Sequence, residues 1–492
     1  MSDAPSTSPA EHHRVAIIGA GFSGLGAAIR LIEAGERDLV VLERAADLGG
    51  CWRDNTYPGV QCDVQSVVYS FSFAPNPAWT REFPWGGEIH AYLQACADRF
   101  GLRPFLRLST EVIDARWDDA AQRWRVETSR GTFTADLLVS GHGGLSAPAR
   151  PRLKGLDGFR GPVFHSAEWR HDVSLAGKRV AVIGTGASAV QIVPSIQPEV
   201  AQLDVYQRTP PWILPRPDHA VGPLRRSLYR RLPFTQRLAR ALRFGTLETR
   251  VIGILTRPEL MRFPEAAARR HLAAQIPDER LRAQLTPGYA MGCKRVLLSN
   301  DFYPALAQPN ASVFTAPIRE ITETGIVTED GEHRPADVIV LCTGFHVADH
   351  PMTRRLRRGD GATLAECSAR NAPAYLGMNV AGFPNLFLLA CGPHTALGHN
   401  SIIYMLEAQL DYLCAAVTEL RRRDATSLCV RQDAAQQFTD EMQRRLRGTV
   451  WSSGCTSFYL DATGRNIALW PGFAFTYRRR TRRFDPDRYT WR

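Results

Sequence analysis

The amino-acid sequence predicts an α/β fold in which a β-α-β unit occurs twice and a helical insert interrupts the second copy. Residues 14–35 run from an apolar strand through a glycine-rich turn into a helix that ends at Gly35. Residues 178–191 repeat this order of strand, turn and helix, and residues 224–290 have a basic, helical pattern. A chain of 492 residues is long enough for two or three domains, which these regions supply.

The first unit has the spacing of a Rossmann-type dinucleotide site. In Gly19-Ala-Gly-Phe-Ser-Gly24 the glycines allow a tight turn, close approach of backbone N–H groups to a pyrophosphate, and close helix–strand packing. The next strand, residues 39–43, ends in Glu43, whose carboxylate accepts a ribose hydroxyl and repels a 2′-phosphate. This pattern predicts FAD or NAD as the ligand. The cofactor-binding residues predicted here are Gly19, Gly21, Phe22, Ser23, Gly24 and Glu43.

The second unit differs from the first at the end of its second strand. Its turn is Gly184-Thr-Gly-Ala-Ser-Ala189, and the following strand, residues 203–208, ends in Arg208 where the first unit has Glu43. A guanidinium pairs with the 2′-phosphate of NADPH, although an arginine after a strand can also be a plain surface residue. The residues predicted to bind NADPH are Gly184, Thr185, Gly186, Ala187, Ser188, Arg208 and Thr209. Two such sites without a dithiol motif indicate that NADPH reduces FAD.

The segments around these units give the predicted domain organisation. Alternating residues at 123–128 and 132–140 indicate an antiparallel layer, and residues 209–223 are rich in proline. A strand is expected at 337–341 and an amphipathic helix at 401–420. We therefore expect a discontinuous FAD-binding domain (1–150 and 380–492), an NADP-binding domain (151–212 and 291–379) and a helical insert (213–290).

Composition narrows the class of protein. The net charge of +11 is spread along the chain, which does not favour nucleic-acid binding. Ten cysteines occur singly without a C-x-x-C pair, which argues against a disulfide framework, a zinc or other metal site, and a redox dithiol. Residues 1–13 have the composition of a short disordered tail rather than a signal peptide, and no apolar run is long enough to span a membrane. We therefore expect a cytoplasmic protein.

A third motif lies just before the second unit. Residues 159–169 read Phe159-Arg-Gly-Pro-Val-Phe-His-Ser-Ala-Glu-Trp169, an F-x-G-x-x-x-H-x-x-x-W pattern. With it the chain resembles, along nearly its whole length, the type I Baeyer–Villiger monooxygenases, which are class B flavoprotein monooxygenases of the flavin-containing monooxygenase superfamily. Arg170 departs from the family pattern, in which Pro or Asp follows the tryptophan. The resemblance implies that the fingerprint residues Phe159, Gly161, His165 and Trp169 belong to a mobile interdomain linker. Without the resemblance, the sequence would predict that His165 is an ordinary linker histidine with satisfied hydrogen bonds.

Three further segments carry the resemblance. Residues 49–63 match G-G-x-W-x-x-x-x-Y-P-G-x-x-x-D, which implies that Trp52 and Asp63 lie against the flavin. Gly292-Cys-Lys-Arg295 implies that Lys294 contacts the NADP 2′-phosphate and that Arg295 reaches the flavin and nicotinamide, although a Lys-Arg pair alone is usually solvated. Residues 337–345 resemble D-x-x-x-L-A-T-G-F/Y, with cysteine at the alanine position. Further predicted cofactor contacts are Gly50, Tyr69, Val112 and Asn400.

The resemblance implies a reaction. Reduced FAD reacts with O2 to give a C4a-peroxide that attacks a ketone, and the product is an ester or lactone. Arg295 and Asp63 are the predicted catalytic residues: the guanidinium favours the anionic peroxide and the carboxylate holds the guanidinium. An N- or S-oxygenating flavin monooxygenase and a non-oxygenating NADPH:acceptor flavoreductase, or a flavoprotein that only binds, remain alternatives. Phe458 stands where the family has a cofactor-contacting tryptophan, and the arginine-rich run 478–483 is interpreted as a solvated surface.

Overall fold

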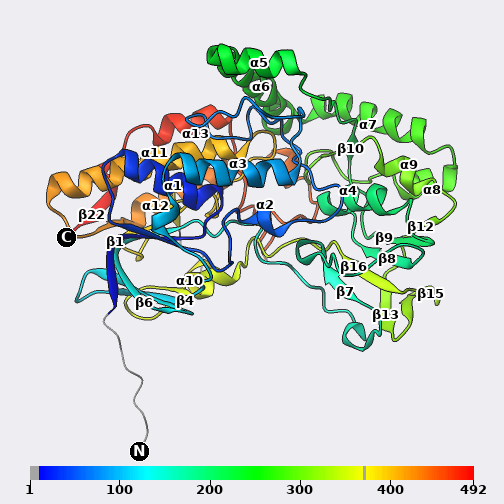
Figure 1. The fold of residues 1–492 in the computed structure, drawn as a ribbon, viewed down its shortest axis with the longest axis horizontal. Coiled ribbons are helices and arrows are strands. Elements are labelled where there is room, and N and C mark those ends of the chain that lie inside the picture. Colours follow the sequence, from blue (N-terminus) through cyan, green and yellow to red (C-terminus); the bar gives the residue numbers. More distant parts are fainter. Residues whose placement is uncertain (1–9, 370–372, 462) are drawn as a thin grey trace, which may run out of the picture.

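The structure is a computed structural model that describes residues 10–369, 373–461 and 463–492. Two modules, each built on a parallel sheet, lie side by side, and a helical hairpin projects from the outer edge of the molecule (Figure 1). This arrangement matches the predicted fold class. No helix in the described ranges has both the length and the apolar character needed to cross a membrane.

The first module contains the first β-α-β unit. Its strands β1 (Glu11–Ile18), β2 (Leu39–Leu42), β3 (Leu106–Arg107), β6 (Gly131–Ser140) and β20 (Leu386–Leu388) are parallel, in the order β3-β2-β1-β6-β20. Helix α1 (Phe22–Glu33) follows β1 after the glycine turn. Strand β6 also pairs antiparallel with β5 (Arg123–Thr128), which pairs with β4 (Val112–Asp118), so the predicted antiparallel layer is confirmed.

Apolar residues on both faces of this sheet form two cores. One core lies between the sheet and the helices α1, α3 (Gly86–Arg99), α11 (Ile402–Arg423), α12 (Gln432–Leu446) and α13 (Ala474–Thr481). The other lies between the sheet and the antiparallel layer, where Trp117 and Trp124 meet edge to face at 5.8 Å. All four residues of β2 are buried, as expected for a strand covered on both faces. Helix α11 begins after Ser401, whose hydroxyl accepts a hydrogen bond from the Ile403 N–H, so the predicted helix is confirmed.

The second module repeats the design. Its sheet is fully parallel in the order β12-β9-β8-β16-β7, with β8 (Arg179–Ile183) at its centre. The other members are β7 (Val163–His165), β9 (Gln202–Tyr206), β12 (Ala311–Phe314) and β16 (Val338–Leu341). Helices α4 (Ala187–Ile196) and α9 (Phe302–Leu306) cover one face. The antiparallel strands β13 (Ile318–Thr322), β14 (Gly325–Thr328) and β15 (His333–Pro335) contribute to the other face.

The insert is helical, as predicted. It contains α5 (Pro223–Arg231), α6 (Pro233–Val251), a π-helical turn (Ile252–Thr256), α7 (Arg262–Gln275) and α8 (Glu279–Gln284). Strand β10 (Ile213–Leu214), the first two residues of the predicted range, pairs with β11 (Leu297–Leu298) after the helices, which closes the insert at its base. The remaining short elements are α2 (Cys51–Asp54), α10 (Leu364–Ala369), β17 (Leu356–Arg357), β18 (Ala374–Tyr375), β19 (Asn379–Val380), β21 (Leu428–Val430) and β22 (Tyr489–Trp491).

Two predicted boundaries need correction. The tail was expected to extend to His13, but Glu11–His13 already form the start of β1. They pair with Phe133–Ala135, so their backbone groups extend the parallel β1–β6 ladder. Residues 1–9 of the predicted tail lie outside the described residues. Strand β17 falls within the range 291–379 predicted for the second domain, yet it pairs with β4 of the first sheet. The chain therefore returns to the first module before Leu356, earlier than position 380.

Candidate active site

A single cavity runs along both glycine-rich turns. Its volume is about 1730 Å³, well above the range of roughly 300 to 1,000 Å³ typical of one small-molecule pocket. Of the predicted site residues, those that line it are Gly19, Gly21, Phe22, Ser23, Glu43, Gly50, Trp52, Asp63, Tyr69, Val112, Gly184, Thr185, Gly186, Ala187, Ser188, Arg208, Thr209, Lys294, Arg295 and Asn400. Residues from both modules and from the C-terminal segment thus share one space large enough for two dinucleotides.

The first glycine turn leaves no room for larger residues at two of its positions. Gly19 has φ of +92°, and a Cβ there would lie 2.8 Å from the Gly141 carbonyl oxygen at the end of β6. A Cβ on Gly24 would lie 1.7 Å from the Gly19 oxygen, which explains why Gly24 does not line the cavity: it allows α1 to pack closely on β1. Gly21 starts α1, whose first N–H groups have no side-chain cap. The turn therefore presents backbone donors to the cavity.

Glu43 is buried and already holds its own turn in place. Its carboxylate accepts hydrogen bonds from the Ala20 N–H at 2.8 Å and the Ala45 N–H at 3.0 Å, and Arg53 Nη1 lies 3.1 Å from it. Two carboxylate oxygens offer about four acceptor positions, so one remains for a hydroxyl group on the cavity side. Arg53 had no predicted role, because nothing in its sequence position shows that it folds back on Glu43.

The second glycine turn repeats this geometry with an open centre. Gly184 has φ of +108°, and a Cβ there would lie 2.4 Å from the Cys342 carbonyl oxygen at the end of β16, just as Gly19 faces Gly141. A Cβ on Gly186 would meet nothing within 4 Å, so the start of α4 faces open space. Thr185 donates its hydroxyl to the Thr209 carbonyl at 3.2 Å and so joins the turn to the end of β9.

Two cations face the cavity beyond this turn. Arg208 follows β9, and Lys294 comes from the loop after the insert. Burial and the nearby positive charge of Arg208 lower the pKa of the Lys294 ammonium group. Lys294 lies over the Tyr289 ring at 4.9 Å, and within the described residues neither cation has a carboxylate partner. Two neighbouring cations without a counter-ion form a site for a highly charged anion.

Asp63 and Arg295 form a bidentate ion pair in the same cavity. Arg295 Nε and Nη2 donate to the two carboxylate oxygens of Asp63 at 2.6 and 2.7 Å. Burial, the largest single effect, would raise the pKa of the Asp63 carboxyl, but the charge and hydrogen bonds of Arg295 together with the charge of Arg216 outweigh it and lower that pKa below its usual value. The Asp63 charge raises the pKa of the Arg295 guanidinium against the effect of burial. About a third of the Arg295 side chain is exposed, toward the cavity that it lines.

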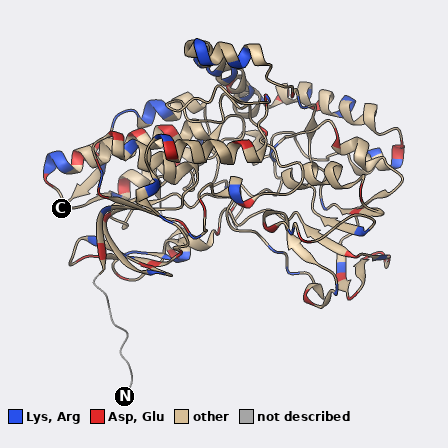
Figure 2. Ribbon diagram, in the orientation of Figure 1, with Lys and Arg blue, Asp and Glu red and all other residues tan. Residues whose placement is uncertain are grey.

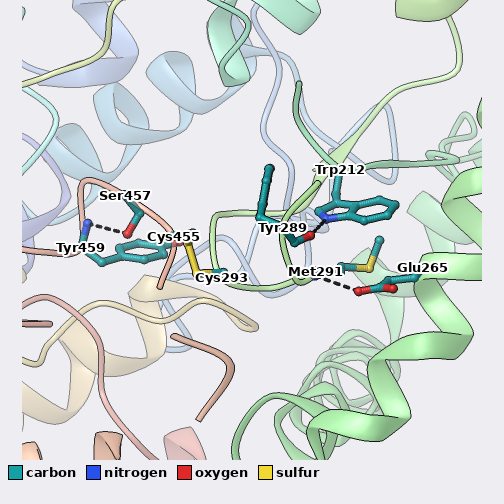
Figure 3. The surroundings of a disulfide bond; sticks show 8 residues. All are labelled: Trp212, Glu265, Tyr289, Met291, Cys293, Cys455, Ser457 and Tyr459. Atoms are coloured by element: carbon teal, nitrogen blue, oxygen red, sulfur yellow. Dashed lines mark hydrogen bonds between the residues drawn. A yellow bond between two sulfur atoms is a disulfide. The ribbon is translucent and has the colours of Figure 1, made fainter. Parts of the chain in front are cut away.

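The loop that carries Arg295 is fixed at three points (Figure 3). Trp212 Nε1 donates to the Tyr289 carbonyl at 2.8 Å, and Glu265 of α7 accepts the Met291 N–H at 3.0 Å. The third point is a disulfide between Cys455 and Cys293, and Cys293 lies two residues before Arg295. The expectation of no disulfide is therefore wrong for this pair. The two cysteines are 162 residues apart in sequence, so their spacing gave no signal.

The C-terminal segment beyond Cys455 completes the wall next to Arg295. Tyr459 is 3% exposed. Burial raises the pKa of the Tyr459 phenol, and the nearby Arg295 charge partly offsets this effect. Phe458 is 50% exposed and lines the cavity, so it forms a wall without a hydrogen-bond donor. Arg250, near the end of α6, is a further charge near the pair: burial lowers the pKa of its guanidinium, and the charges of Asp63 and Arg295 also act on that pKa. Neither Tyr459 nor Arg250 was predicted, since both reach the site only through tertiary packing.

The segment 49–63 joins the two modules. Gln191 of α4 accepts a hydrogen bond from the Tyr57 hydroxyl at 3.1 Å and donates to the Gln61 carbonyl at 2.8 Å. A Cβ on Gly59 would lie 2.7 Å from the Gln191 carbonyl oxygen, so only glycine fits at this contact. Trp52 Nε1 donates to the Tyr69 hydroxyl at 3.2 Å. The segment that carries Asp63 is therefore held by both modules.

The fingerprint residues lie outside the cavity. His165 ends β7, the edge strand of the second sheet, so this part of the segment is built into a module and is not a free linker. Its Nδ1 accepts the Ala167 N–H at 3.1 Å, whereas its buried Nε2 has no partner within the described residues, so its hydrogen bonds are only half satisfied. Gly161 is required because a Cβ would lie 2.2 Å from the Asp337 carbonyl oxygen. Phe159 joins a core, and Trp169 meets Phe164 edge to face at 5.1 Å.

Other predicted positions have local partners. Asn400 lines the cavity, but its amide donates to Glu248 of α6 at 2.7 Å and its oxygen accepts the Ser401 N–H at 2.7 Å. His399 Nε2 lies 3.1 Å from the same carboxylate. Arg170, at the position that departs from the family pattern, is exposed and pairs with Asp172. Glu248 therefore fastens the insert to the loop before α11.

Comparisons with known proteins agree with this geometry. A family model described as flavin-binding monooxygenase-like matches residues 12–355. A Baeyer-Villiger monooxygenase of Streptomyces coelicolor is 51% identical, covering 97% of this chain and 92% of that protein. Another, of Pseudomonas aeruginosa, is 49% identical and covers 99% and 93%.

Solved structures give the same picture. An OTEMO complex with FAD and NADP has a TM-score of 0.88 at 26% identity, covering 98% of this chain and 100% of that chain. A closed crystal structure of cyclohexanone monooxygenase has a TM-score of 0.87 at 27% identity, covering 98% and 99%. An oxidized steroid monooxygenase bound to NADP has a TM-score of 0.84 at 31% identity, covering 96% and 97%.

Proposed function

Because this chain belongs to the flavin-binding monooxygenase-like family, we propose that it oxidises a ketone to an ester or lactone with Arg295 as its catalytic charge and Asp63 as the residue that positions Arg295. The chain is an FAD- and NADPH-dependent monooxygenase of the Baeyer–Villiger type, as the sequence predicts. The observation that carries the assignment of the residues is the bidentate Arg295–Asp63 pair in a cavity that both glycine turns share.

The first glycine turn fits FAD. Its backbone donors at the start of α1 suit a pyrophosphate, and the buried Glu43 carboxylate suits a ribose hydroxyl while repelling a 2′-phosphate. Trp52 and Tyr69 form a joined aromatic wall of the same cavity, which suits a flat ring system. When bound, FAD would supply the redox chemistry with O2, which protein side chains cannot supply.

The second glycine turn fits NADPH. The open space beside Gly186 leaves room for a pyrophosphate at the start of α4. Arg208 and Lys294 lie close enough for their charges to interact, so a 2′-phosphate between them would relieve their repulsion. NADH lacks that phosphate, so it offers nothing that would neutralise these two cations.

Arg295 is suited to stabilise negative charge on the substrate. A guanidinium stays protonated at any physiological pH, and here Asp63 raises its pKa further. When a ketone carbonyl is attacked, its oxygen becomes an oxyanion, and a fixed cation nearby lowers the energy of that state. Asp63 accepts hydrogen bonds from Nε and Nη2 of Arg295, which leaves Nη1 outside this ion pair in a residue that lines the cavity. The carboxylate thus fixes the plane of the guanidinium through two hydrogen bonds.

The test is the Arg295→Ala variant, assayed for ketone oxidation and, separately, for reduction of bound FAD by NADPH under anaerobic conditions. We expect ester formation to fall by about 100- to 1,000-fold, the usual effect of removing an oxyanion donor, while FAD is still retained and reduced. Arg295→Lys keeps the charge but loses the planar contact with Asp63, and it should recover only part of the rate. Ester formation at the parental rate in Arg295→Ala would show that the role belongs to another residue.

The substrate class is tested with a ketone, a thioether and an amine in parallel. Ester as the main product supports the ketone assignment. Sulfoxide or hydroxylamine with no ester would identify an S- or N-oxygenating enzyme. NADPH oxidation with none of these products would identify a flavoreductase.

A further inference from the structure

The helical hairpin α5–α6 exposes an unusual number of apolar side chains. It forms the outermost edge of the insert (Figure 1). Six large apolar residues within positions 224–242 are well exposed: Leu224 at 86%, Leu228 at 44%, Leu232 at 46%, Phe234 at 62%, Leu238 at 56% and Leu242 at 63%. Single exposed apolar residues are normal on proteins, but a contiguous group of them indicates a surface that contacts something else.

Helix α6 carries apolar side chains on its outer side in addition to those that it buries, unlike an ordinary surface helix. Its inner side packs Ala239, Phe244 and Leu247 against the first core. Polar contacts also hold it there: Gln236 donates to the Asn76 carbonyl at 2.7 Å, and Arg240 donates to the Ser70 carbonyl at 2.8 Å. Its outer side carries Phe234, Leu238 and Leu242, spaced four residues apart, which places them within an arc of about 80°. These inner contacts fix the orientation of α6, so the stripe of Phe234, Leu238 and Leu242 faces outward and is not exposed through loose packing of the helix.

The charge of the hairpin has one sign. Residues 219–247 contain no Asp or Glu, and Figure 2 shows basic positions along the hairpin. The inward arginines are paired: Arg225 and Arg243 lie 3.1 and 3.0 Å from Glu82. Arg240, also on the inner side, lies 3.7 Å from Glu407. Four further arginines within positions 219–247 have no carboxylate partner within the described residues: Arg226, Arg230, Arg231 and Arg237. The outer surface thus combines exposed apolar side chains with unneutralised positive charge.

We propose that the α5–α6 hairpin is a membrane-surface site that rests its apolar stripe in the headgroup region of an anionic bilayer. A helix with Leu and Phe on one side and arginine beside them lies in the plane of such a surface, where lipid phosphates neutralise the guanidinium groups. A second copy of this chain fits less well, because a two-fold contact would bring the same arginines together without any carboxylate to separate them.

The experiment is a flotation assay with the full-length holoenzyme. Vesicles of phosphatidylcholine with about 30% phosphatidylserine are compared with pure phosphatidylcholine, at low salt and at about 0.5 M NaCl. We expect binding to the anionic vesicles only, weakened several-fold by the added salt. Equal binding to both vesicle types, or binding to neither, would overturn the proposal.

Variants locate the contact. Leu238→Glu combined with Leu242→Glu should weaken vesicle binding by about tenfold or more, and Arg230→Gln combined with Arg231→Gln by about fivefold for each arginine. The matched control is Ile113→Glu, because Ile113 is 53% exposed on β4, on another surface. The control should bind like the parent. Unchanged circular dichroism and NADPH-dependent FAD reduction establish that each variant is folded.

The occupant is checked by mass. The parent chain and Leu238→Glu are measured by analytical ultracentrifugation without vesicles. A monomer in both cases supports the membrane assignment. A parental dimer that Leu238→Glu dissociates, with no change in vesicle binding, would assign the stripe to a second copy instead.

Discussion

The two sides of the Asp63–Arg295 pair are built in different ways. Asp63 ends a motif that directly follows the first β-α-β unit, in a segment that both modules hold through Gln191. Arg295 lies 232 residues later, on a loop that Trp212, Glu265 and Cys455 fix from three directions. The first side depends on a local motif, whereas the second is assembled from distant segments. Both must be in place before the bidentate contact can form.

Removing Asp63 should have a larger effect on turnover than removing any one of the contacts that fix the Arg295 loop. In Asp63→Ala the guanidinium of Arg295 keeps its charge but loses both contacts that fix its plane. We expect ketone oxidation to fall by about 10- to 100-fold, the range seen when an outer partner of a reactive group is removed. The measurement is kcat for ester formation, together with the rate of FAD reduction by NADPH, which should change much less.

Asp63→Glu and Asp63→Asn distinguish positioning from charge. Glu keeps the carboxylate one methylene farther out, and Asn keeps the shape without the charge. If Asp63 acts by holding Arg295, Glu should recover part of the activity. If Asp63→Asn is as active as the parent, the ion pair has no role in positioning.

The same contrast between local and assembled parts separates what the sequence predicted from what it did not. The strands and helices of both β-α-β units were predictable because each is specified by its own apolar pattern and turn. Glu43 and Arg208 follow from position at the end of a strand. Arg53 on Glu43 and Tyr459 beside Arg295 were not predictable, because each depends on packing between segments that no local pattern connects.

Family resemblance filled part of this gap and also misplaced one feature. It brought Asp63 and Arg295 to one site, which no spacing rule could do across 232 residues. It also implied that the segment with His165 is a linker, whereas β7 pairs with β16 as the edge strand of the second sheet. A motif shows which residues recur in a family, but it does not show which strand they pair with in the fold, as β7 and β16 illustrate.

On the assembled side, Lys294 should matter for binding rather than for chemistry. Its ammonium group and Arg208 face the same part of the cavity without a carboxylate partner among the described residues. We expect Lys294→Ala to raise the KM for NADPH by about tenfold, the loss of one charge-assisted contact, with little change for NADH. The check is steady-state kinetics with both nucleotides.

Lys294→Arg is the matched control, since it keeps a cation at the same place. It should retain most of the preference for NADPH, and it should do so to higher pH, because burial and Arg208 lower the pKa of the lysine. An equal rise in KM for both nucleotides in Lys294→Ala would point to a structural role in the loop.

The disulfide should have the smallest effect on turnover, because it is one of three points that fix the Arg295 loop. In Cys455→Ser the Trp212 and Glu265 contacts remain, so we expect kcat for ester formation to fall by only a few-fold. The melting temperature should fall as well, because cross-links that close long loops typically contribute about 2 to 4 kcal/mol. Treating the parent with a reductant should reproduce both changes, whereas Cys414→Ser, which removes a cysteine outside any disulfide, should show neither. A lower melting temperature with unchanged kcat would mean that Trp212 and Glu265 alone hold Arg295 in place, and that the assembled side is less dependent on Cys455 than the geometry indicates.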